Sequence, residues 1–300
     1  MQLDIEFSHL SVEAAAAVRL PDDIRVNKVW ESLFVATPQT KELHSILQEM
    51  KTRPDTLKPR GLVVHGDTDV GKSWTLDRFV RIHPPRPNAE SEWSDYDAIR
   101  IDTPADYSWS RTCHNILDAL NWPNQLRPTE RHLHAHTVHL IARAQVKLLI
   151  FDEFTNVAEA GKSGVRLDEY RRMLRALINE SKRPVVVSGM KEVTSVILLD
   201  QQLGSRITDQ YELRPLKLNT GFPAAFTSFC FASPLRRATD IKDKLLIRDA
   251  FEKTGGCMGS LSNLMRIASL MAIMSGEERI TRDILNDIQD RSIGNSVIDR

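Results

Sequence analysis

One stretch of the chain constrains its fold more than any other. Residues 61–73 read GLVVHGDTDVGKS, in which an apolar run leads directly into two glycines separated by four residues and followed by a lysine and a serine. The apolar run is typical of a buried strand, and the following KSWTLDRFVRI is typical of a helix that ends before Pro84. A strand, a glycine-rich loop and a helix in direct succession predict an α/β fold with a phosphate-binding loop.

Each residue type in this loop suits the binding of a nucleoside triphosphate. Glycines let the backbone fold round the phosphates, and the following helix adds the positive end of its dipole. We expect Lys72 to reach the β- and γ-phosphates of ATP and the Ser73 hydroxyl to ligate Mg²⁺. An ordinary glycine-containing turn is the alternative, which the flanking strand and helix disfavour. The predicted nucleotide-binding residues of the loop are Gly66, Asp67, Thr68, Asp69, Val70, Gly71, Lys72 and Ser73.

A second apolar run, LLIF at residues 148–151, ends in Asp152 and Glu153. Acids at the carboxyl end of a buried strand lie where parallel sheets hold their ligands. We expect Asp152 to bind the nucleotide through the Mg²⁺ shell and Glu153 to polarise the attacking water as general base. A surface pair of acids fits poorly after four apolar residues. The order of loop, extra strand and Asp-Glu is that of ATPases, and no acceptor signature of a metabolic kinase is visible.

Two further residues would complete the site of a hydrolysing ATPase. The apolar run PVVVSGM at residues 184–190 contains polar Ser188, where a sensor residue could contact the γ-phosphate or the water. Arg206 comes just before the last predicted core strand. An arginine there can point out of its own subunit and stabilise transition-state charge in a neighbouring site, as arginine fingers do. A solvated or intrachain ion-paired arginine is the alternative.

The order of apolar patterns along the chain predicts the architecture. From residue 56 to 218, short apolar strands alternate with helices, which favours a mostly parallel sheet covered on both faces. From about residue 219 the pattern changes to helices only. We therefore expect an N-terminal helical segment over residues 1–55, a three-layer α/β core over 56–218, and a C-terminal helical lid and tail over 219–300.

Composition bears on the cellular compartment and on the kinds of partner that we expect for the chain. Lys and Arg together number 40, as do Asp and Glu, so the net charge is zero and any nucleic-acid surface must be local. The three cysteines are far apart and suit a reducing cytosol. No signal peptide and no apolar run of roughly 20 residues is visible. We expect a soluble, cytoplasmic protein without a membrane segment.

The ordered motifs resemble a known group, the AAA+ ATPases of DNA transposition of the TniB and TnsC type, with MuB as a functional relative. RLPDDIRVNKV at residues 19–29 looks like the segment that opens TniB-like proteins, and GLVVHGDTDVGKS, LLIFDEFTN and LRALINESKRPVVVSGMKEV follow in the family's order. LDQQLGSRITDQYELRPL is similar to the family's D-x-Q-L-x-x-R stretch, where Arg206 is the finger. GGCMGSLSNLMRIA looks like the family's lid.

The resemblance implies a specific activity. Proteins of this type bind ATP, assemble into rings or filaments on double-stranded DNA, recruit the transposase to that target and disassemble on hydrolysis. Some take their target from a sequence-specific DNA-binding partner, and others from a CRISPR-linked adaptor. The partners implied for this chain are double-stranded DNA, a transposase, a target-selection protein and further copies of the chain itself.

The chain departs from the family's pattern at two places. The family usually has Gly-Thr after the sensor strand, whereas this chain has Ser188, Gly189 and Met190. The lid helix has no arginine directly after GGCMGS, and Arg266 comes further along. Slow hydrolysis, suited to a timer, would be consistent with both departures.

Basic residues on two segments are candidates for phosphate contacts, which position a protein on DNA without reading its sequence. Arg171 and Arg175 share a helix face, and interspersed acids offer a salt-bridged exposed helix as the alternative. The candidate DNA-binding residues are Arg111, Arg166, Arg171 and Arg175. His132, His136 and His139 have the spacing of zinc ligands, but no suitable carboxylate or cysteine accompanies them, so a polar helix face is favoured.

Two other functions stay open from the sequence. A helicase loader or replication-initiator relative would have the same fold, but initiators usually carry a separate helix-turn-helix module, and none is clear after residue 219. A nucleotide-gated adaptor would scarcely hydrolyse ATP and would act by protein contacts alone. The presence of Lys72, Asp152 and Glu153 argues against an inactive site.

Overall fold

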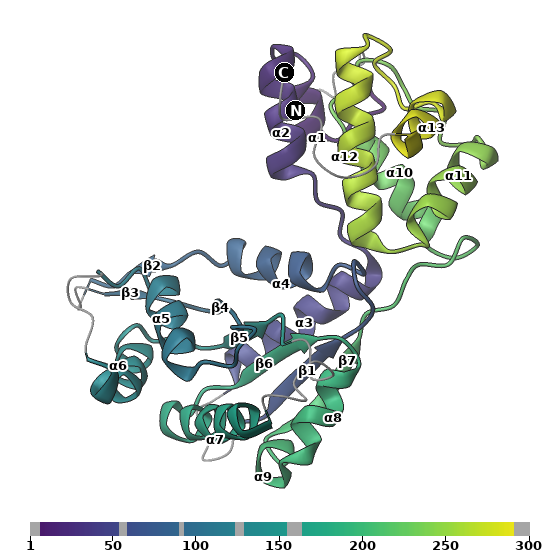
Figure 1. Ribbon diagram of the computed structural model, residues 1–300. Coiled ribbons are helices and arrows are strands. Elements are labelled where there is room, and N and C mark those ends of the chain that lie inside the picture. Colours follow the sequence, from purple (N-terminus) through teal and green to yellow (C-terminus); the bar gives the residue numbers. More distant parts are fainter. Residues whose placement is uncertain (1–6, 54–58, 90–92, 124–128, 155–163, 291–300) are drawn as a thin grey trace. The chain divides into compact units, whose positions relative to one another are not determined.

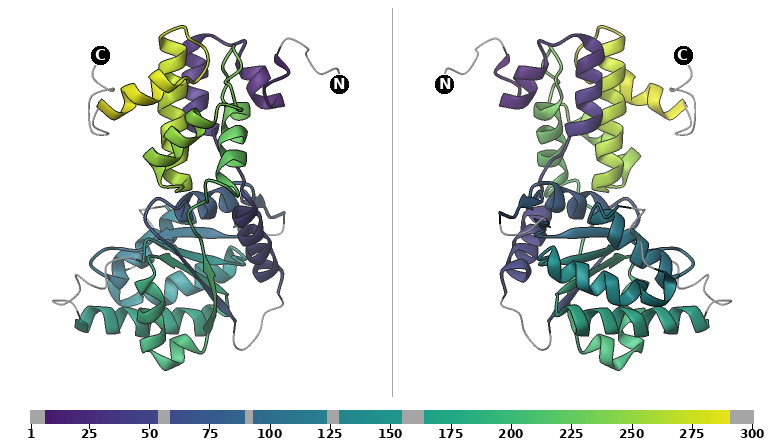
Figure 2. Two further views of the ribbon diagram at one scale, coloured as in Figure 1. Left: turned by 90° about the vertical axis from the view of Figure 1, so that its right-hand side faces the viewer. Right: turned by 90° about the vertical axis from the view of Figure 1, so that its left-hand side faces the viewer.

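The computed structural model describes residues 7–53, 59–89, 93–123, 129–154 and 164–290 (Figure 1, Figure 2). The chain divides into two compact units. The sheet unit comprises Gln39–Leu213, and the helical unit comprises Met1–Pro38 together with Arg214–Arg300. Each unit has apolar clusters of its own, so each is described by itself.

The sheet unit is built on five parallel strands in the order β4-β5-β6-β1-β7. Their bounds are β1 (Gly61–His65), β4 (Ile99–Asp102), β5 (Leu149–Asp152), β6 (Val185–Gly189) and β7 (Ile207–Glu212). β1, β5 and β6 are buried along their whole length, as expected for strands covered on both faces. β6 lies between β1 and β5, so one strand separates the phosphate loop from the paired acids.

Helices cover both faces of this sheet, and Figure 1 shows α4 on one side and α7 and α8 on the other. On one face, Leu43 of α3 (Pro38–Thr52) and Leu76 of α4 (Lys72–Arg81) pack with Leu62 and Val64 of β1. The helices of the other face are α5 (Trp109–Ala119), α6 (Glu130–Arg143), α7 (Gly164–Ser181), α8 (Glu192–Leu199) and α9 (Gln201–Gly204). A short antiparallel pair, β2 (Arg86–Pro87) and β3 (Ser94–Asp95), precedes β4.

Alternation along the strands decides which polar side chains face α4. Ile150 and Val186 pack in the apolar cluster on the α4 face. Asp152 and Ser188 come two residues later on the same strands, so they face the same side. Arg100 faces the α4 side as well, because its two neighbours on β4, Ile99 and Ile101, pack in the apolar cluster on the other face.

The helical unit consists of the first and last helices of the chain. Its elements are α1 (Val12–Ala17), α2 (Asp22–Ser32), α10 (Phe222–Ala232), α11 (Lys244–Thr254), α12 (Met258–Met274) and α13 (Arg282–Asp290). The Asp243 carboxylate accepts hydrogen bonds at the start of α11, and Gly255, with φ of 57°, ends it. α2 lies alongside α12 (Figure 2), and Val29 and Leu33 share a core with Met265.

The parallel sheet between two layers of helices, followed by a helical C-terminal region, confirms the predicted fold class. The units differ from the predicted boundaries at residues 55 and 218. Within residues 1–55, α2 packs in the helical unit while α3 packs on the sheet, because the apolar side chains of each helix complete a different core. The C-terminal segment of the helical unit begins at Arg214 rather than at residue 219.

Candidate nucleotide-binding site

The loop between β1 and α4 has a backbone that requires its glycines. A Cβ atom at Gly66 would lie 2.3 Å from the carbonyl oxygen of Leu213, so a larger residue does not fit. Gly71 precedes α4 with φ of 102°, a conformation that favours glycine. Within the described chain, no side chain caps this helix start. Such helix starts bind anions well, because the N–H groups of the first turn point outward along the helix dipole.

Lys72 is the first residue of α4, and its ammonium group turns back to the loop. Its Nζ donates hydrogen bonds to the carbonyl oxygens of Gly66, at 2.8 Å, and Asp67, at 2.7 Å. These two hydrogen bonds hold the ammonium group against the backbone of the loop. Of the other predicted loop residues, Val70 is buried, Ser73 is half-buried, and Asp67, Thr68 and Asp69 are exposed.

Asp152 ends β5 with its side chain buried to 1% exposure. Its Oδ1 accepts a 2.9 Å hydrogen bond from the backbone N–H of Glu153. Its Oδ2 has no hydrogen-bond partner among the described residues, and lies 3.4 Å from Nε of Arg100. A buried carboxylate oxygen without a donor suits a metal ligand, and Mg²⁺ in nucleotide sites often has only one or two protein ligands.

Glu153 and Ser188 lie beside Asp152 at the carboxyl edge of the sheet. Glu153 is exposed and has a left-handed backbone with φ of 54°. Ser188 is fully buried opposite Val64 of β1, and its Oγ has no hydrogen-bond partner in the described chain. The backbone N–H of Phe154 donates to the Ser188 carbonyl oxygen at 2.8 Å, which ties the end of β5 to β6. The sheet therefore brings together the loop, the acids and Ser188.

Arg206 is not brought to this edge. It comes directly before β7, and its carbonyl oxygen accepts a 2.6 Å hydrogen bond from the N–H of Gly61, the first residue of β1. The loop follows the last residue of β1, so Arg206 lies at the opposite edge of the parallel sheet. Its Nε and Nη1 atoms are buried and have no hydrogen-bond partner within the described residues.

The predicted DNA-binding arginines are largely engaged within the chain. Arg171 and Arg175 pair with Asp168, at 2.6 Å, and Asp200, at 3.0 Å. These contacts match the salt-bridged helix that the sequence left as an alternative. The Arg111 side chain is 63% exposed and lies 3.5 Å from Asp106. The side chain of Arg166 falls outside the described part of the structure.

Two histidines of α6 contact aromatic and acidic side chains of neighbouring segments. His134 Nδ1 accepts a 3.2 Å hydrogen bond from Trp109 Nε1, and its Nε2 donates to Glu180 Oε2 at 3.1 Å. The His136 ring lies edge-on to Trp122, with 5.2 Å between ring centroids. Among the residues that the structure describes, no group of three or more His, Cys, Asp or Glu could hold a metal ion.

Two residues that sequence reasoning missed support the site. His44 of α3 contacts the Thr75 carbonyl oxygen of α4 at 2.9 Å, and so joins the two helices of one face. Burial lowers the pKa of His44 below its ordinary value, against the opposing effect of that bond. Arg100 of β4 contacts Asp152. The alternation of apolar and charged residues in IRID, residues 99–102, was the available signal that Arg100 faces α4.

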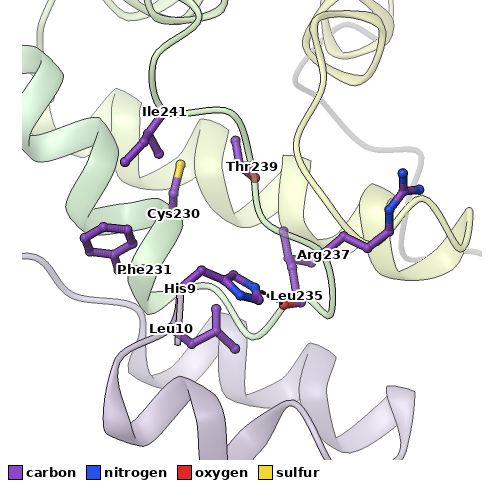
Figure 3. Close-up of a pocket in the computed structure, with 8 residues that line it drawn as sticks. All are labelled: His9, Leu10, Cys230, Phe231, Leu235, Arg237, Thr239 and Ile241. Carbon is purple, nitrogen blue, oxygen red and sulfur yellow. Dashed lines mark hydrogen bonds between the residues drawn. The ribbon is translucent and has the colours of Figure 1, made fainter. Parts of the chain in front are cut away.

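A small pocket lies within the helical unit (Figure 3). The residues that line it include His9, Cys230, Arg237 and Thr239 (Figure 3). The His9 Nε2 atom lies 3.1 Å from the Leu235 carbonyl oxygen. Burial raises the pKa of Cys230 to about 12, so this thiol stays protonated and unreactive at neutral pH.

Solved structures with the same fold include replication proteins. The chain aligns with the Aeropyrum pernix ORC2 protein in ADPNP and ADP complexes at a TM-score of 0.60 and 16% identity, covering 89% of this chain and 72% of that one. The A. pernix ORC1 protein in complex with DNA aligns at a TM-score of 0.61 and 13% identity, covering 88% of this chain and 68% of that one. Cdc6p from Pyrobaculum aerophilum aligns at a TM-score of 0.60 and 14% identity, covering 90% of this chain and 72% of that one. At these identities the likeness establishes an AAA+ fold.

Other comparisons bear on the family and on the membrane. No helix of the described chain is both long and apolar enough to cross a membrane. A search of curated proteins finds no match to the sequence. The sequence does match the family described as "Bacterial TniB protein" over residues 25–216. Because this match covers well over half of the 300 residues, the chain belongs to the TniB family of AAA+ proteins.

Proposed function

We propose that this protein is an ATP-dependent regulator of DNA transposition. In this proposal it binds ATP with Mg²⁺, oligomerises on double-stranded target DNA, recruits the transposase, and leaves the DNA when ATP is hydrolysed. The observation that carries the proposal is the carboxyl edge of the sheet. There a glycine-dependent loop, Lys72 and the buried Asp152 meet in a chain of the TniB family.

The chain's own residues account for the steps of hydrolysis. Lys72 would exchange its loop carbonyl partners for phosphate oxygens, while Ser73 and Asp152 would hold the metal. The exposed Glu153 carboxylate would accept the proton of the attacking water. The buried Ser188 hydroxyl would donate to the γ-phosphate or to the water. Bound Mg²⁺ and ATP supply the reacting phosphoryl group and neutralise the charge that develops on it.

The position of Arg206 supports a site shared between copies of the chain. It lies at the sheet edge opposite its own loop, with two guanidinium nitrogens lacking partners in the described chain. A neighbouring copy could therefore present Arg206 to the γ-phosphate, where it would stabilise the transition state. In this arrangement assembly and hydrolysis depend on each other, which is what an ATP-timed oligomer needs.

Contacts with DNA would be few in each subunit and would add up along an oligomer. Arg111 is the most exposed of the candidate arginines whose side chains are described. The A. pernix ORC1 structure in complex with DNA supports the expectation that this fold can bind DNA. Net charge of zero is no obstacle, because phosphate contacts are local. The transposase and a target-selection protein complete the set of proposed partners.

Negative-stain imaging of the purified protein with double-stranded DNA tests the proposal. We expect rings or filaments with ATP or a slowly hydrolysed analogue, and dispersed particles without nucleotide. With ATP, Glu153→Gln should give assemblies that persist on DNA, whereas the matched variant Glu169→Gln, at an exposed glutamate of α7, should behave as the wild type. Particles that stay monomeric in every condition would contradict the proposal and support a nucleotide-gated adaptor.

The fold likeness to ORC and Cdc6 proteins favours a second candidate, a helicase loader or replication-initiator relative. Such a protein should bind a replicative helicase or single-stranded DNA. The two candidates are separated by comparing assembly on single-stranded and double-stranded DNA of equal length. Preference for the duplex supports the transposition regulator, and preference for single strands supports the loader.

A further inference from the structure

A single arginine lies among three carboxylates behind the proposed metal site. Arg100 contacts Asp102 Oδ1 at 2.5 Å through Nη2 and Asp152 Oδ2 at 3.4 Å through Nε. Its Nη1 lies 3.7 Å from Oδ1 of Asp77. The Arg100 side chain is 26% exposed. Burial lowers the pKa of Arg100, but the Asp102 hydrogen bond and the nearby carboxylates outweigh it and raise the pKa.

Arg100 joins the two elements that carry the proposed metal ligands. Asp77 comes four residues after Ser73 on α4, so the two side chains lie on the same helix face. Asp152 ends β5, and the strand register sets Asp102 directly opposite it. The guanidinium therefore bridges α4 and β5 immediately beside Asp152.

The contact with Asp152 is incomplete as a salt bridge. The pair is long at 3.4 Å, and Oδ2 of Asp152 has no hydrogen bond in the described chain. A carboxylate that is 1% exposed needs positive charge nearby, because burying an unpaired charge is costly. Three carboxylates around one arginine leave the cluster net negative and able to accept another cation.

We propose that Arg100 is a positioning residue that serves as the resident counter-cation of Asp152 and thereby sets the Mg²⁺ concentration that the site requires. This inference rests on the proposed nucleotide site. Without metal, the guanidinium places a positive charge beside the Asp152 carboxylate and holds α4 next to β5. When Mg²⁺ binds, it does so against this fixed positive charge, so Arg100 weakens metal binding while it stabilises the metal-free protein.

The test measures binding of a fluorescent ATP analogue while free Mg²⁺ is titrated. For Arg100→Gln, the Mg²⁺ concentration at half-maximal binding should fall by at least about threefold, because a nearby positive charge is removed. In EDTA, the Tm of this variant should lie below that of the wild type. Mg²⁺ with nucleotide should then raise its Tm by more than it raises the wild-type Tm.

Two further variants keep the test decisive. Arg81→Gln removes another cation from Asp77, at 2.5 Å, without touching Asp152, and should leave the Mg²⁺ midpoint within about twofold of wild type. Arg100→Lys keeps the charge and should also stay within about twofold. If Arg100→Gln does not fold, a midpoint for Arg100→Lys shifted by threefold or more would overturn the proposal.

The outcomes separate this inference from the function on which it rests. If the wild type binds the analogue with Mg²⁺ but Arg100→Gln has an unchanged or higher midpoint, Arg100 is not the counter-cation, and the nucleotide site stands. If the wild type shows no Mg²⁺-dependent binding at any concentration, the proposed function itself is contradicted, and this inference falls with it.

Discussion

Two buried arginine–carboxylate contacts, one in each unit, are built in opposite ways. In the helical unit, Arg25 is fully buried and donates to both oxygens of Glu278, at 2.9 and 2.7 Å. Arg236 adds two more hydrogen bonds to the same carboxylate, through its backbone N–H and its Nη1. In the sheet unit, Arg100 approaches Asp152 only at 3.4 Å, and one carboxylate oxygen keeps no hydrogen bond in the described chain.

We interpret the difference as that between a structural contact and the proposed metal site. Burial alone would raise the pKa of Glu278, but its hydrogen bonds with Arg25 and the Arg236 backbone lower it. Both oxygens of this carboxylate therefore have hydrogen-bond donors within the protein. Asp152 is equally buried but has one hydrogen-bond donor and an imperfect ion pair. The helical unit uses its charges to join α2 to the turn after α12, whereas the sheet unit leaves capacity for a ligand.

The largest expected effect comes from breaking the contact between Arg25 and Glu278. Glu278→Gln should lower the free energy of unfolding by about 2–3 kcal/mol, because the buried Arg25 guanidinium would then face a neutral amide and keep only the exposed carboxylate of Asp22. Chemical denaturation followed by circular dichroism measures this change. The neighbouring Glu277→Gln, at a carboxylate that is 35% exposed, should cost far less, because solvent screens its ion pairs. Equal losses from both substitutions would show that burial does not distinguish the two glutamates.

Asp152→Asn should change stability little and ligand binding strongly. It removes a buried charge that the protein only partly satisfies, so the free energy of unfolding should change by no more than about 1 kcal/mol. Mg²⁺-dependent binding of a fluorescent ATP analogue should weaken by at least about tenfold. A loss of stability as large as that of Glu278→Gln, with binding retained, would mean that Asp152 is structural.

Ser188→Ala sharpens the same contrast with a neutral group. The buried Oγ has no partner in the described chain, so its removal should leave stability unchanged or raise it by up to about 1 kcal/mol. Turnover of ATP should fall by at least about tenfold if the hydroxyl contacts the γ-phosphate or the water. Ser195→Ala, at an exposed hydroxyl of α8, is the matched control for turnover. A clear loss of stability in Ser188→Ala would argue for a structural hydroxyl instead.

The smallest expected effect concerns pH and the packing of α3 on α4. Burial lowers the pKa of His44, so the unfolded chain binds its proton more readily than the folded chain. The neutral ring therefore contributes stability that is present above the ordinary histidine pKa near 6.5 and is lost as pH falls below it. Between pH 7.5 and 5.5, the Tm of His44→Gln should fall less than the Tm of the wild type. Parallel pH profiles would exclude His44 as a contributor.

Local patterns in the sequence were sufficient for the parts of the fold that consecutive residues build. GLVVHGDTDVGKS predicted β1, the loop and α4, and LLIFDE predicted β5 with its terminal acids, because apolar runs and glycines act over short distances. The AAA+ fold and the TniB family are confirmed. The roles of Lys72, Glu153 and the other site residues stay predictions.

What the sequence could not predict depends on contacts between distant segments. Arg100 meets Asp77 and Asp152 only through the register of β4 with β5 and the packing of α4 on the sheet. The separation of α2 from α3 likewise depends on which core each apolar face completes. Neither relation appears in the spacing of nearby residues, because both are set by tertiary packing.

In the proposed function, the carboxyl edge of the sheet binds and hydrolyses ATP in response to DNA. The measurement that tests it most directly is steady-state ATP hydrolysis by the purified chain, with and without double-stranded DNA. We predict Mg²⁺-dependent turnover that DNA changes and that Lys72→Ala and Glu153→Gln each abolish. Turnover that persists in both variants, or no turnover and no ATP binding in any condition, would contradict it.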